Sequence, residues 1–509
     1  MANLLPTLVR KELLGHMRTL RLVVALVFTV LLCLLTTIMG SFDYSRNMRQ
    51  YERVVSENRD RMAETRVFER LQPNTVLPPQ PVQILCRGIV QAAGQSFDVR
   101  FEEYVIGARS LGRSSADDLL FTLAQVDFVA VVSLVLSFLA IALGFDAICG
   151  EREQGTLRLL LSHAVPRGQI VAAKLIGGFL SVWTPLAVAY ALSLLVLQAN
   201  PDVEFSGDDW LRLALLFLLT CLFLAEVFAL AVLVSACTQR AATSLIFCLF
   251  GWLVLGAGCA SALPAIARST LDWPPWMDYV ENRNAEFDAY GRQMKEWDSQ
   301  PPRPAAAAFL GLERDGVLRY AHPSAAAWLD ARSAYDFDKI LERADRVHRH
   351  RTQNQMPLAD QQFAVDEWSV LSPITGYRAL AKWLARSTLD DAFEVSYHGM
   401  RYRRTYIDFL RARFAARGWR RWHTDDPPDT PAMIEDPAAV TPAMLEEGSD
   451  FQRQRLAWAE DRWEQDQQDP RRQLDLRDLP DAGPDWQRTT GESIQRMLPG
   501  LLIMVLTLG

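Results

Sequence analysis

Five long, nearly charge-free apolar runs constrain this chain more than any other feature of its sequence. A bilayer core about 30 Å thick is crossed by roughly 20 apolar residues in a helix. The average composition hides these runs, since 22% of the 509 residues are charged and the mean hydropathy is only +0.02. The pattern predicts a mainly α-helical, polytopic membrane protein rather than a large soluble enzyme. The expected spans cover residues 22–40, 128–149, 169–198, 211–237 and 244–265.

The last apolar segment, residues 494–509, is too short to be a complete span. From Met497 onward it reaches only about 20 Å at 1.5 Å per residue. We expect the start of a sixth span that the chain does not complete, with a re-entrant tail as the alternative. The first apolar run is longer than a signal peptide's core of about 7–15 residues, and no small-residue cleavage site follows it. It is therefore expected to be retained.

The charges of the short loops predict the orientation of the spans. Cations precede the first span and lie between the second and third spans and between the fourth and fifth, whereas the short loop 199–210 is acidic. The positive-inside rule places residues 1–21, 150–168 and 238–243 in the cytoplasm. The cations that decide this are Arg10, Lys11, Arg18, Arg21, Arg152, Arg158, Arg167 and Arg240.

Two long loops then fall outside the membrane and are expected to be folded domains, residues 41–127 and 266–493. The second is predicted to be mostly helical, with helical periodicity over 333–353 and 387–418. In the first, the short apolar runs 82–90 and 97–107 are candidate strands. Residues 1–21 place Leu5, Val9, Leu13 and Leu20 on one face, which favours an amphipathic helix in the membrane interface over a plain extension of the first span.

The cytoplasmic segment 150–168 reads GEREQGTLRLLLSHAVPRG. Gly155 suits a turn, Thr156 is a good N-cap, and Pro166 ends the helix before the next span. Leu157, Leu160 and Leu161 form an apolar ridge at helical spacing. Such a helix either lies in the membrane interface as an anchor or inserts into a groove on a partner protein. Periodicity alone leaves both interpretations open.

The stretch GFDAICGEREQGTLRLLLSHAVPRGQIVAAKLIGG resembles a segment of ABC-2-type permeases, the membrane subunits of ATP-driven transporters. The chain is most similar to a subgroup of these permeases with enlarged extracytoplasmic domains. One departure is Ala173, where the family carries glycine beside the position of Lys174. The resemblance implies that residues 151–165 form a coupling helix that contacts an ABC ATPase subunit. The implied interface comprises Glu151, Arg152, Glu153, Gly155, Thr156, Leu157, Leu160, Leu161, Pro166 and Arg167.

The same resemblance implies the rest of the functional assignment. The chain contains no G-x-x-x-x-G-K-[ST] phosphate loop, so ATP is expected on the partner subunit, with no enzyme activity and no cofactor or metal on this chain. A second permease copy, or a similar permease, and a bacterial inner membrane are implied. The expected function is that of the permease subunit of an exporter. The alternative is a membrane-anchored extracytoplasmic scaffold or sensor without transport.

A few residues have two interpretations. Glu226 lies in the middle of the fourth span, where an ionisable group lines a polar path or bonds a neighbouring helix. His348 and His350 resemble a metal-binding pair, but without neighbouring cysteines a solvated helix face is favoured. Basic residues of the outer domains are interspersed with acids, which argues against nucleic-acid binding.

Overall fold

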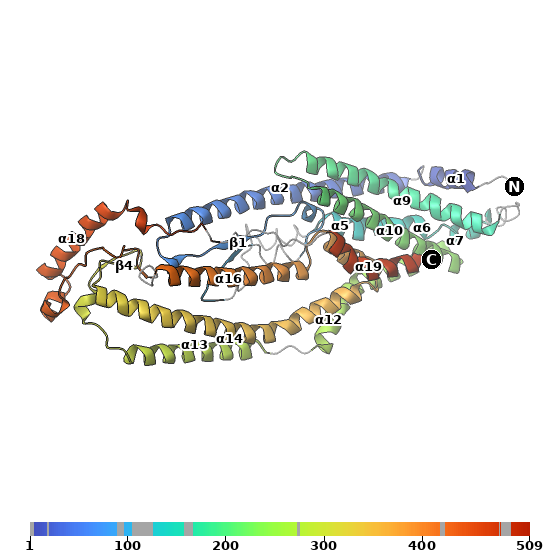
Figure 1. The fold of residues 1–509 in the computed structure, drawn as a ribbon. Helices are drawn as coiled ribbons and strands as arrows, with labels where there is room; N and C mark the ends of the chain where they lie inside the picture. The colour runs from blue at the N-terminus through green and yellow to red at the C-terminus, as the bar shows by residue number, and fades with distance from the viewer. Residues whose placement is uncertain are drawn as a thin grey trace.

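The computed structural model describes residues 5–17, 20–88, 96–103, 126–156, 166–271, 275–417, 423–477, 479 and 490–508. The molecule is elongated (Figure 1). The apolar helices and both termini lie in one half, and the rest of the chain forms a second body that extends away from them. We call the first half the bundle and the second the distal domain.

Among the residues that the structure describes, five helical segments of the bundle are long and apolar enough to cross a membrane, which confirms the predicted mainly α-helical, polytopic fold. The short helix α1 (Leu5–Met17) precedes the first of them and packs against the third. The five segments are α2 (Leu20–Glu64); α5 (Phe128–Val131), the π-helical turn η3 (Val132–Leu136), α6 (Ser137–Gly144) and α7 (Cys149–Glu153); α9 (Arg167–Gln198); α10 (Gly207–Cys237); and α11 (Ala241–Leu253), the π-helical turn η4 (Val254–Gly258) and α12 (Cys259–Thr270).

The first span continues directly into the distal domain. The sequence places a domain boundary at residue 40, but α2 runs unbroken for 45 residues, or about 68 Å at 1.5 Å per residue. No proline interrupts it, and Gly40 fits inside the helix where it passes close to Ile84. The second half of α2 is therefore a rigid extension of a membrane span rather than a separate outer helix.

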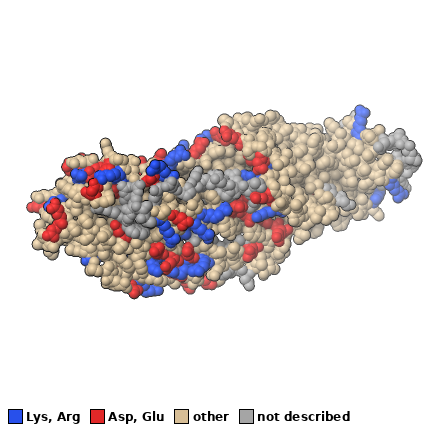
Figure 2. All heavy atoms as spheres, viewed as in Figure 1, with Lys and Arg blue, Asp and Glu red and all other residues tan. Residues whose placement is uncertain are grey.

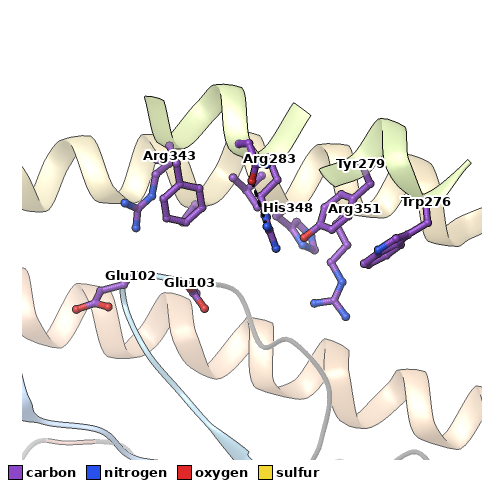
Figure 3. Close-up of a pocket in the computed structure, with 12 residues that line it drawn as sticks. Glu102, Glu103, Trp276, Tyr279, Arg283, Arg343, His348 and Arg351 are labelled. Atoms are coloured by element: carbon purple, nitrogen blue, oxygen red, sulfur yellow. Dashed lines mark hydrogen bonds between the residues drawn. The ribbon is translucent and has the colours of Figure 1, made fainter. Parts of the chain in front are cut away.

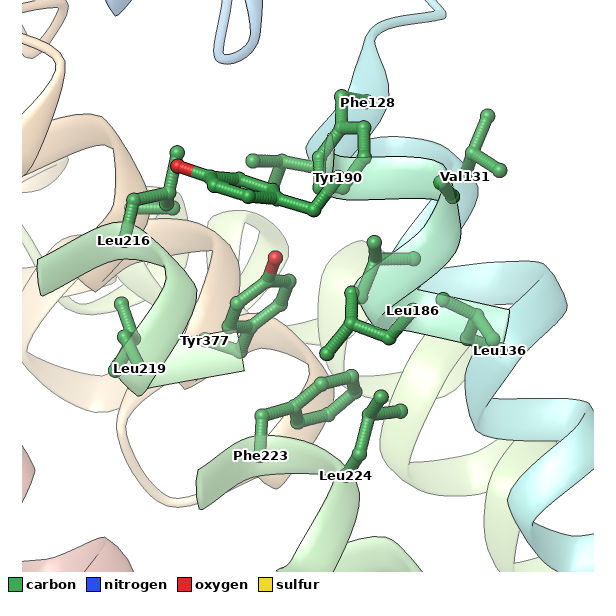
Figure 4. Packing of buried hydrophobic residues seen from close by; sticks show 14 of the residues in the cluster. Phe128, Val131, Leu136, Leu186, Tyr190, Leu216, Leu219, Phe223, Leu224 and Tyr377 are labelled. Carbon is green, nitrogen blue, oxygen red and sulfur yellow. The ribbon is translucent and has the colours of Figure 1, made fainter. Parts of the chain in front are cut away.

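One helix of the second outer loop belongs to the core of the bundle. The sequence assigns 266–493 to a single outer domain, whereas α15 (Pro373–Leu384) packs its apolar face against α10 and α19 (Thr490–Leu508). Tyr377 stacks on Phe223 of α10, with ring centroids 4.4 Å apart. Figure 4 shows its ring among buried side chains of the spans. The loop between the fifth span and α19 thus returns into the bundle before it re-enters the distal domain.

The distal domain is mostly helical, as predicted. In its described part, two antiparallel sheets of two strands each accompany the helices, and every strand is three residues long. The expected strand over 82–90 is wrong in its first half, because Pro81–Ile84 forms a 3-10 helix. The described helices of the distal domain are α13 (Trp276–Ser299), α14 (Pro323–Ser369), α16 (Leu389–Arg417) and α18 (Asp450–Asp466). Its strands are β1 (Asn74–Val76) with β2 (Ser96–Asp98), and β3 (Leu312–Arg314) with β4 (Val317–Arg319). Its 3-10 turns are Phe68–Arg70, Pro81–Ile84, Ala306–Phe309, Pro437–Ala439, Pro442–Leu445 and Pro470–Arg472.

Two clusters hold the distal domain together. An apolar core joins the β1–β2 region to α14 and α16, and Tyr406 donates a hydrogen bond to Leu71 O across it. Near α18, Arg472 pairs with Asp425 and Asp426 at 3.2 and 2.9 Å. These charges are almost fully buried, so their mutual pairing offsets the cost of removing them from water.

Charge is distributed very unevenly along the molecule. Figure 2 shows acidic and basic side chains interspersed over the distal domain, whereas the visible face of the bundle is almost uncharged. Lys and Arg reappear at the far end of the bundle. An uncharged lateral surface of this kind suits contact with lipid hydrocarbon.

A candidate coupling site at the end of the bundle

The described first part of the predicted coupling segment lies at the end of the bundle away from the distal domain (Figure 1). Its first part, residues 150–156, is described and is called the anchored turn below. Gly155 has a φ of +75°, the left-handed conformation that glycine adopts without strain. Thr156 donates a hydrogen bond to Glu151 O at 3.2 Å, which closes the turn. Leu157, Leu160 and Leu161 lie outside the described residues.

Glu151 and Lys174 together fasten the anchored turn to α9 and α1. Lys174 of α9 is only 5% exposed, and its Nζ lies 2.8 Å from Glu151 Oε1 and 3.3 Å from Glu12 Oε1. Gly177, one turn further along α9, has no side chain to keep α1 away; a Cβ there would lie 2.8 Å from the Cβ of Glu12. A buried lysine with two carboxylate partners therefore joins three segments of the chain.

Arg152 and Glu153 fasten the same turn to the fourth and fifth spans. Arg152 donates hydrogen bonds to Thr238 O and Ala236 O, at 2.8 and 3.3 Å, at the C-terminal end of α10. A cation there satisfies exposed carbonyls and interacts favourably with the helix dipole. Glu153 accepts a hydrogen bond from the backbone N–H of Ala241, the first residue of α11, at 3.1 Å. A carboxylate at the N-terminal end of a helix accepts hydrogen bonds from the free backbone N–H groups there and interacts favourably with the positive end of the helix dipole.

A side chain that the sequence did not single out completes the anchoring. The hydroxyl of Ser235 in α10 accepts hydrogen bonds from the backbone N–H groups of Ile148 and Cys149, at 3.0 and 3.1 Å. The start of α7 is therefore held against α10 before the charged residues begin. No sequence signal distinguishes this serine from the others in the spans, because its role depends on two helices meeting.

The remaining predicted interface residues begin the next span. Pro166 occupies the N-cap position of α9, and Arg167 is the first residue of that helix. Both are exposed. The structure therefore gives Glu151, Arg152 and Glu153 partners within the chain, and leaves Pro166 and Arg167 on the surface beside them.

Glu226 makes a contact between helices. Its side chain is 2% exposed, and Oε1 accepts a hydrogen bond from Thr507 of α19 at 2.6 Å. Within the described part of the chain, Oε2 has no hydrogen-bond partner. Of the two interpretations offered by the sequence, the interhelical bond is present in the structure.

Together, these features define an integral membrane protein whose spans converge on one charged turn. Comparison with known proteins identifies the class more closely. Residues 7–313 match the family model described as ABC-2 family transporter protein. This range covers more than half of the chain, so the chain belongs to that family, which confirms the resemblance seen in the sequence. The match includes all five candidate spans and the anchored turn.

Two curated relatives carry the same name, "Probable ABC transporter permease protein NosY". The one from Pseudomonas aeruginosa is 32% identical over 133 residues, which are 25% of this chain and 48% of that protein. The one from Stutzerimonas stutzeri is 31% identical over 100 residues, 19% of this chain and 36% of that protein. The chain thus spans about half the length, or less, of the curated relatives it matches.

Proposed function

We propose that this protein is the permease subunit of an ATP-driven exporter, and that a separate ABC ATPase subunit docks on residues 151–165. One observation carries the proposal. The anchored turn is bonded to α9, α10 and α11 through Glu151, Arg152 and Glu153, and Lys174 of α9 continues the link to Glu12 of α1. A force applied to this turn reaches three helices directly and α1 through Lys174, which is what a coupling element requires.

The fourth span carries this connection to the end of the bundle that faces the distal domain (Figure 1). At the end of α10 away from the turn, Arg212 donates hydrogen bonds to Leu384 O at 2.9 Å and to Ser493 Oγ at 3.3 Å. Asp208, four residues earlier, pairs with Arg386 at 2.8 Å. A helix of 31 residues is about 46 Å long. We propose that α10 acts as a rigid rod between the ATPase side and α15, whose chain continues through Arg386 into α16 of the distal domain.

The proposed orientation places the anchored turn and the N-terminus in the cytoplasm of a bacterium, with the distal domain outside its inner membrane. The Lys and Arg side chains at that end of the bundle support this (Figure 2). Export, as the direction of transport, rests on the family resemblance. ATP hydrolysis belongs to the partner in this proposal, and the permease chain itself holds no cofactor.

We also propose that the permease works with a second copy of itself or a similar chain. The fifth span supports this, since only 6% of its most apolar window is buried within the chain, against 72% for the second span. Phe247, Phe250 and Leu253 are among its exposed apolar side chains. A second permease packed on this face would cover them.

The decisive experiment is co-purification of the protein with an ABC ATPase subunit expressed beside it. Wild type is compared with a Leu157→Ser/Leu160→Ser/Leu161→Ser variant, which removes the apolar ridge. We expect wild type to retain the ATPase and the variant to lose it while still inserting into the membrane.

A matched control replaces three exposed leucines nearer the other end of the bundle, Leu195→Ser/Leu211→Ser/Leu218→Ser, and is expected to retain the ATPase. Equal retention by both triple variants would show that the ridge is only an interfacial anchor. Retention without ATP-dependent movement of any substrate would favour the scaffold or sensor function.

A further inference from the structure

The distal domain contains a cavity of about 370 Å³ between α13, α14 and the chain around residues 102–103. This volume lies in the range of small-molecule binding pockets. The cavity is far from the anchored turn, and nothing in the coupling mechanism uses it. Figure 3 shows Arg283 and Arg351 pointing toward the space below the two helices, with Glu102 and Glu103 on the opposite side.

Two arginines that line the cavity, Arg283 and Arg343, are not held in ion pairs by the described residues around them. Arg343 is 8% exposed, and its guanidinium lies over the rings of Phe287 and Tyr290, 4.4 and 4.5 Å from their centroids. Arg283 donates a hydrogen bond to the amide oxygen of Asn284. In the part of the chain that the structure describes, neither forms an ion pair with a carboxylate. A buried cation without an ion-pair partner, such as Arg343, favours an anionic ligand.

Other arginines on α14 behave differently. Arg346 pairs with Glu286 of α13 at 2.6 Å, and Arg332 pairs with Asp298 of α13 at 2.8 Å. The interface between the two helices therefore neutralises cations outside the cavity but not Arg283 and Arg343 inside it. This contrast sets Arg283 and Arg343 apart from the paired arginines of the same helix interface.

The remaining walls are aromatic and apolar. Tyr279, Phe287 and Val347 contribute to the lining, together with Trp276 at one end. Trp276 begins α13, six residues after the end of the fifth candidate span at Thr270. Apolar walls beside cations match a ligand with a hydrocarbon or aromatic part and an anionic group. The aromatic end also lies close to where the chain leaves the membrane-spanning segment.

We propose that this cavity binds an amphiphilic organic anion, a phosphate ester or carboxylate attached to an apolar group. The anionic group lies between Arg283 and Arg343, and the apolar group lies on Tyr279 and Phe287. Three arginines and two glutamates line the cavity, so the balance of these charges is positive. The proposal does not depend on the ATPase-coupling function, because it concerns ligand binding by the permease chain alone.

The test is equilibrium binding of radiolabelled dodecyl phosphate to the full chain in phosphatidylcholine nanodiscs, with empty nanodiscs subtracted. We expect saturable binding to wild type and at least a tenfold loss of affinity in Arg283→Gln/Arg343→Gln. The charge-matched control Arg332→Gln/Arg349→Gln, on the same helix pair but outside the cavity, is expected to bind like wild type. Arg283→Lys/Arg343→Lys keeps the charge and should retain most of the binding, which separates charge recognition from misfolding.

Competition with the labelled dodecyl phosphate shows which chemical groups of the ligand are recognised. Unlabelled dodecanol, which lacks the charge, and inorganic phosphate, which lacks the apolar group, are both expected to compete poorly. Effective competition by either one, or unchanged affinity in the glutamine variant, would overturn the proposal. Phenyl phosphate then distinguishes the source of the ligand. Strong competition by it indicates a water-soluble anion, and weak competition indicates one drawn from the bilayer; both agree with the proposed chemistry.

Discussion

Replacing Lys174 with methionine tests whether the buried ion-pair cluster anchors α1. The lysine Nζ lies 2.8 Å from Glu151 and 3.3 Å from Glu12. Methionine keeps the apolar stem of the side chain but removes the charge between the two carboxylates. We expect the uncompensated carboxylates to repel each other, so that α1 detaches from α9 more often. The apolar contacts beside Gly177 are left unchanged.

The free-energy cost of Lys174→Met depends on how deeply Lys174, Glu12 and Glu151 are buried. Removing one partner of a fully buried ion pair costs about 3–5 kcal/mol. The side chains of Glu12 and Glu151 are 20% and 23% exposed, so water solvates them in part once the lysine is gone. We therefore expect about 2 kcal/mol, below the range for full burial. Because 1.4 kcal/mol is a factor of ten, the detached population of α1 should rise roughly 30-fold.

Hydrogen exchange of the backbone amides in residues 5–17 measures this population, since exchange tracks local opening when reclosing is fast. Lys11→Met, which removes an exposed cation from α1 itself, is the control and should leave the rate nearly unchanged. Adding Glu12→Gln and Glu151→Gln to Lys174→Met removes the repulsion and should restore part of the protection. A change of less than threefold in Lys174→Met would refute the anchoring role.

Three further predictions concern packing and pH. Gly177→Leu places a Cβ 2.8 Å from the nearest α1 atom and should expose α1 to protease, whereas Gly168→Leu, with open space around it, should not. Tyr377→Phe removes the hydroxyl 3.0 Å from Thr220 and should cost about 1 kcal/mol, against about 3–5 kcal/mol for Tyr377→Ala, measured by thermal unfolding; equal losses would contradict the packing. Burial is the main cause that lowers the pKa of His348, and neighbouring arginines lower it further. Its folded pKa lies below the unfolded one, so its stabilisation is present above about pH 6.5 and is lost as pH falls through the folded pKa. His348→Phe should flatten the fall in unfolding temperature between pH 7 and 5, and an unchanged slope would contradict this.

The spans could be predicted from the sequence because a bilayer imposes a requirement on each segment separately. A helix such as α10 is recognised from the apolar character of its own residues, whatever its neighbours are. The charged turn could be found for a similar reason, since its residues follow one another in the chain. The sequence also indicated that Gly155 suits a turn, and its φ of +75° agrees.

The position of α15 could not be predicted in this way. Its twelve residues are too few for a span, and they form one apolar and one polar face, as in any amphipathic surface helix. What places it in the bundle is the match between Tyr377 and the Phe223–Thr220 face of α10. That match joins residues more than 150 positions apart, and no local pattern encodes it.

By itself, the sequence determined that this protein crosses a membrane several times, that one short charged loop carries a recognisable motif, and that the family is that of ABC-2 transporters. Only the tertiary structure decided what the charges of that motif do. Glu151, Arg152 and Glu153 were predicted only as part of a surface for a partner, and the structure shows that they also bond to Lys174 and to the ends of α10 and α11. The physical reason is that hydropathy is a property of each residue, whereas an ion pair or a helix cap exists only where two distant segments meet.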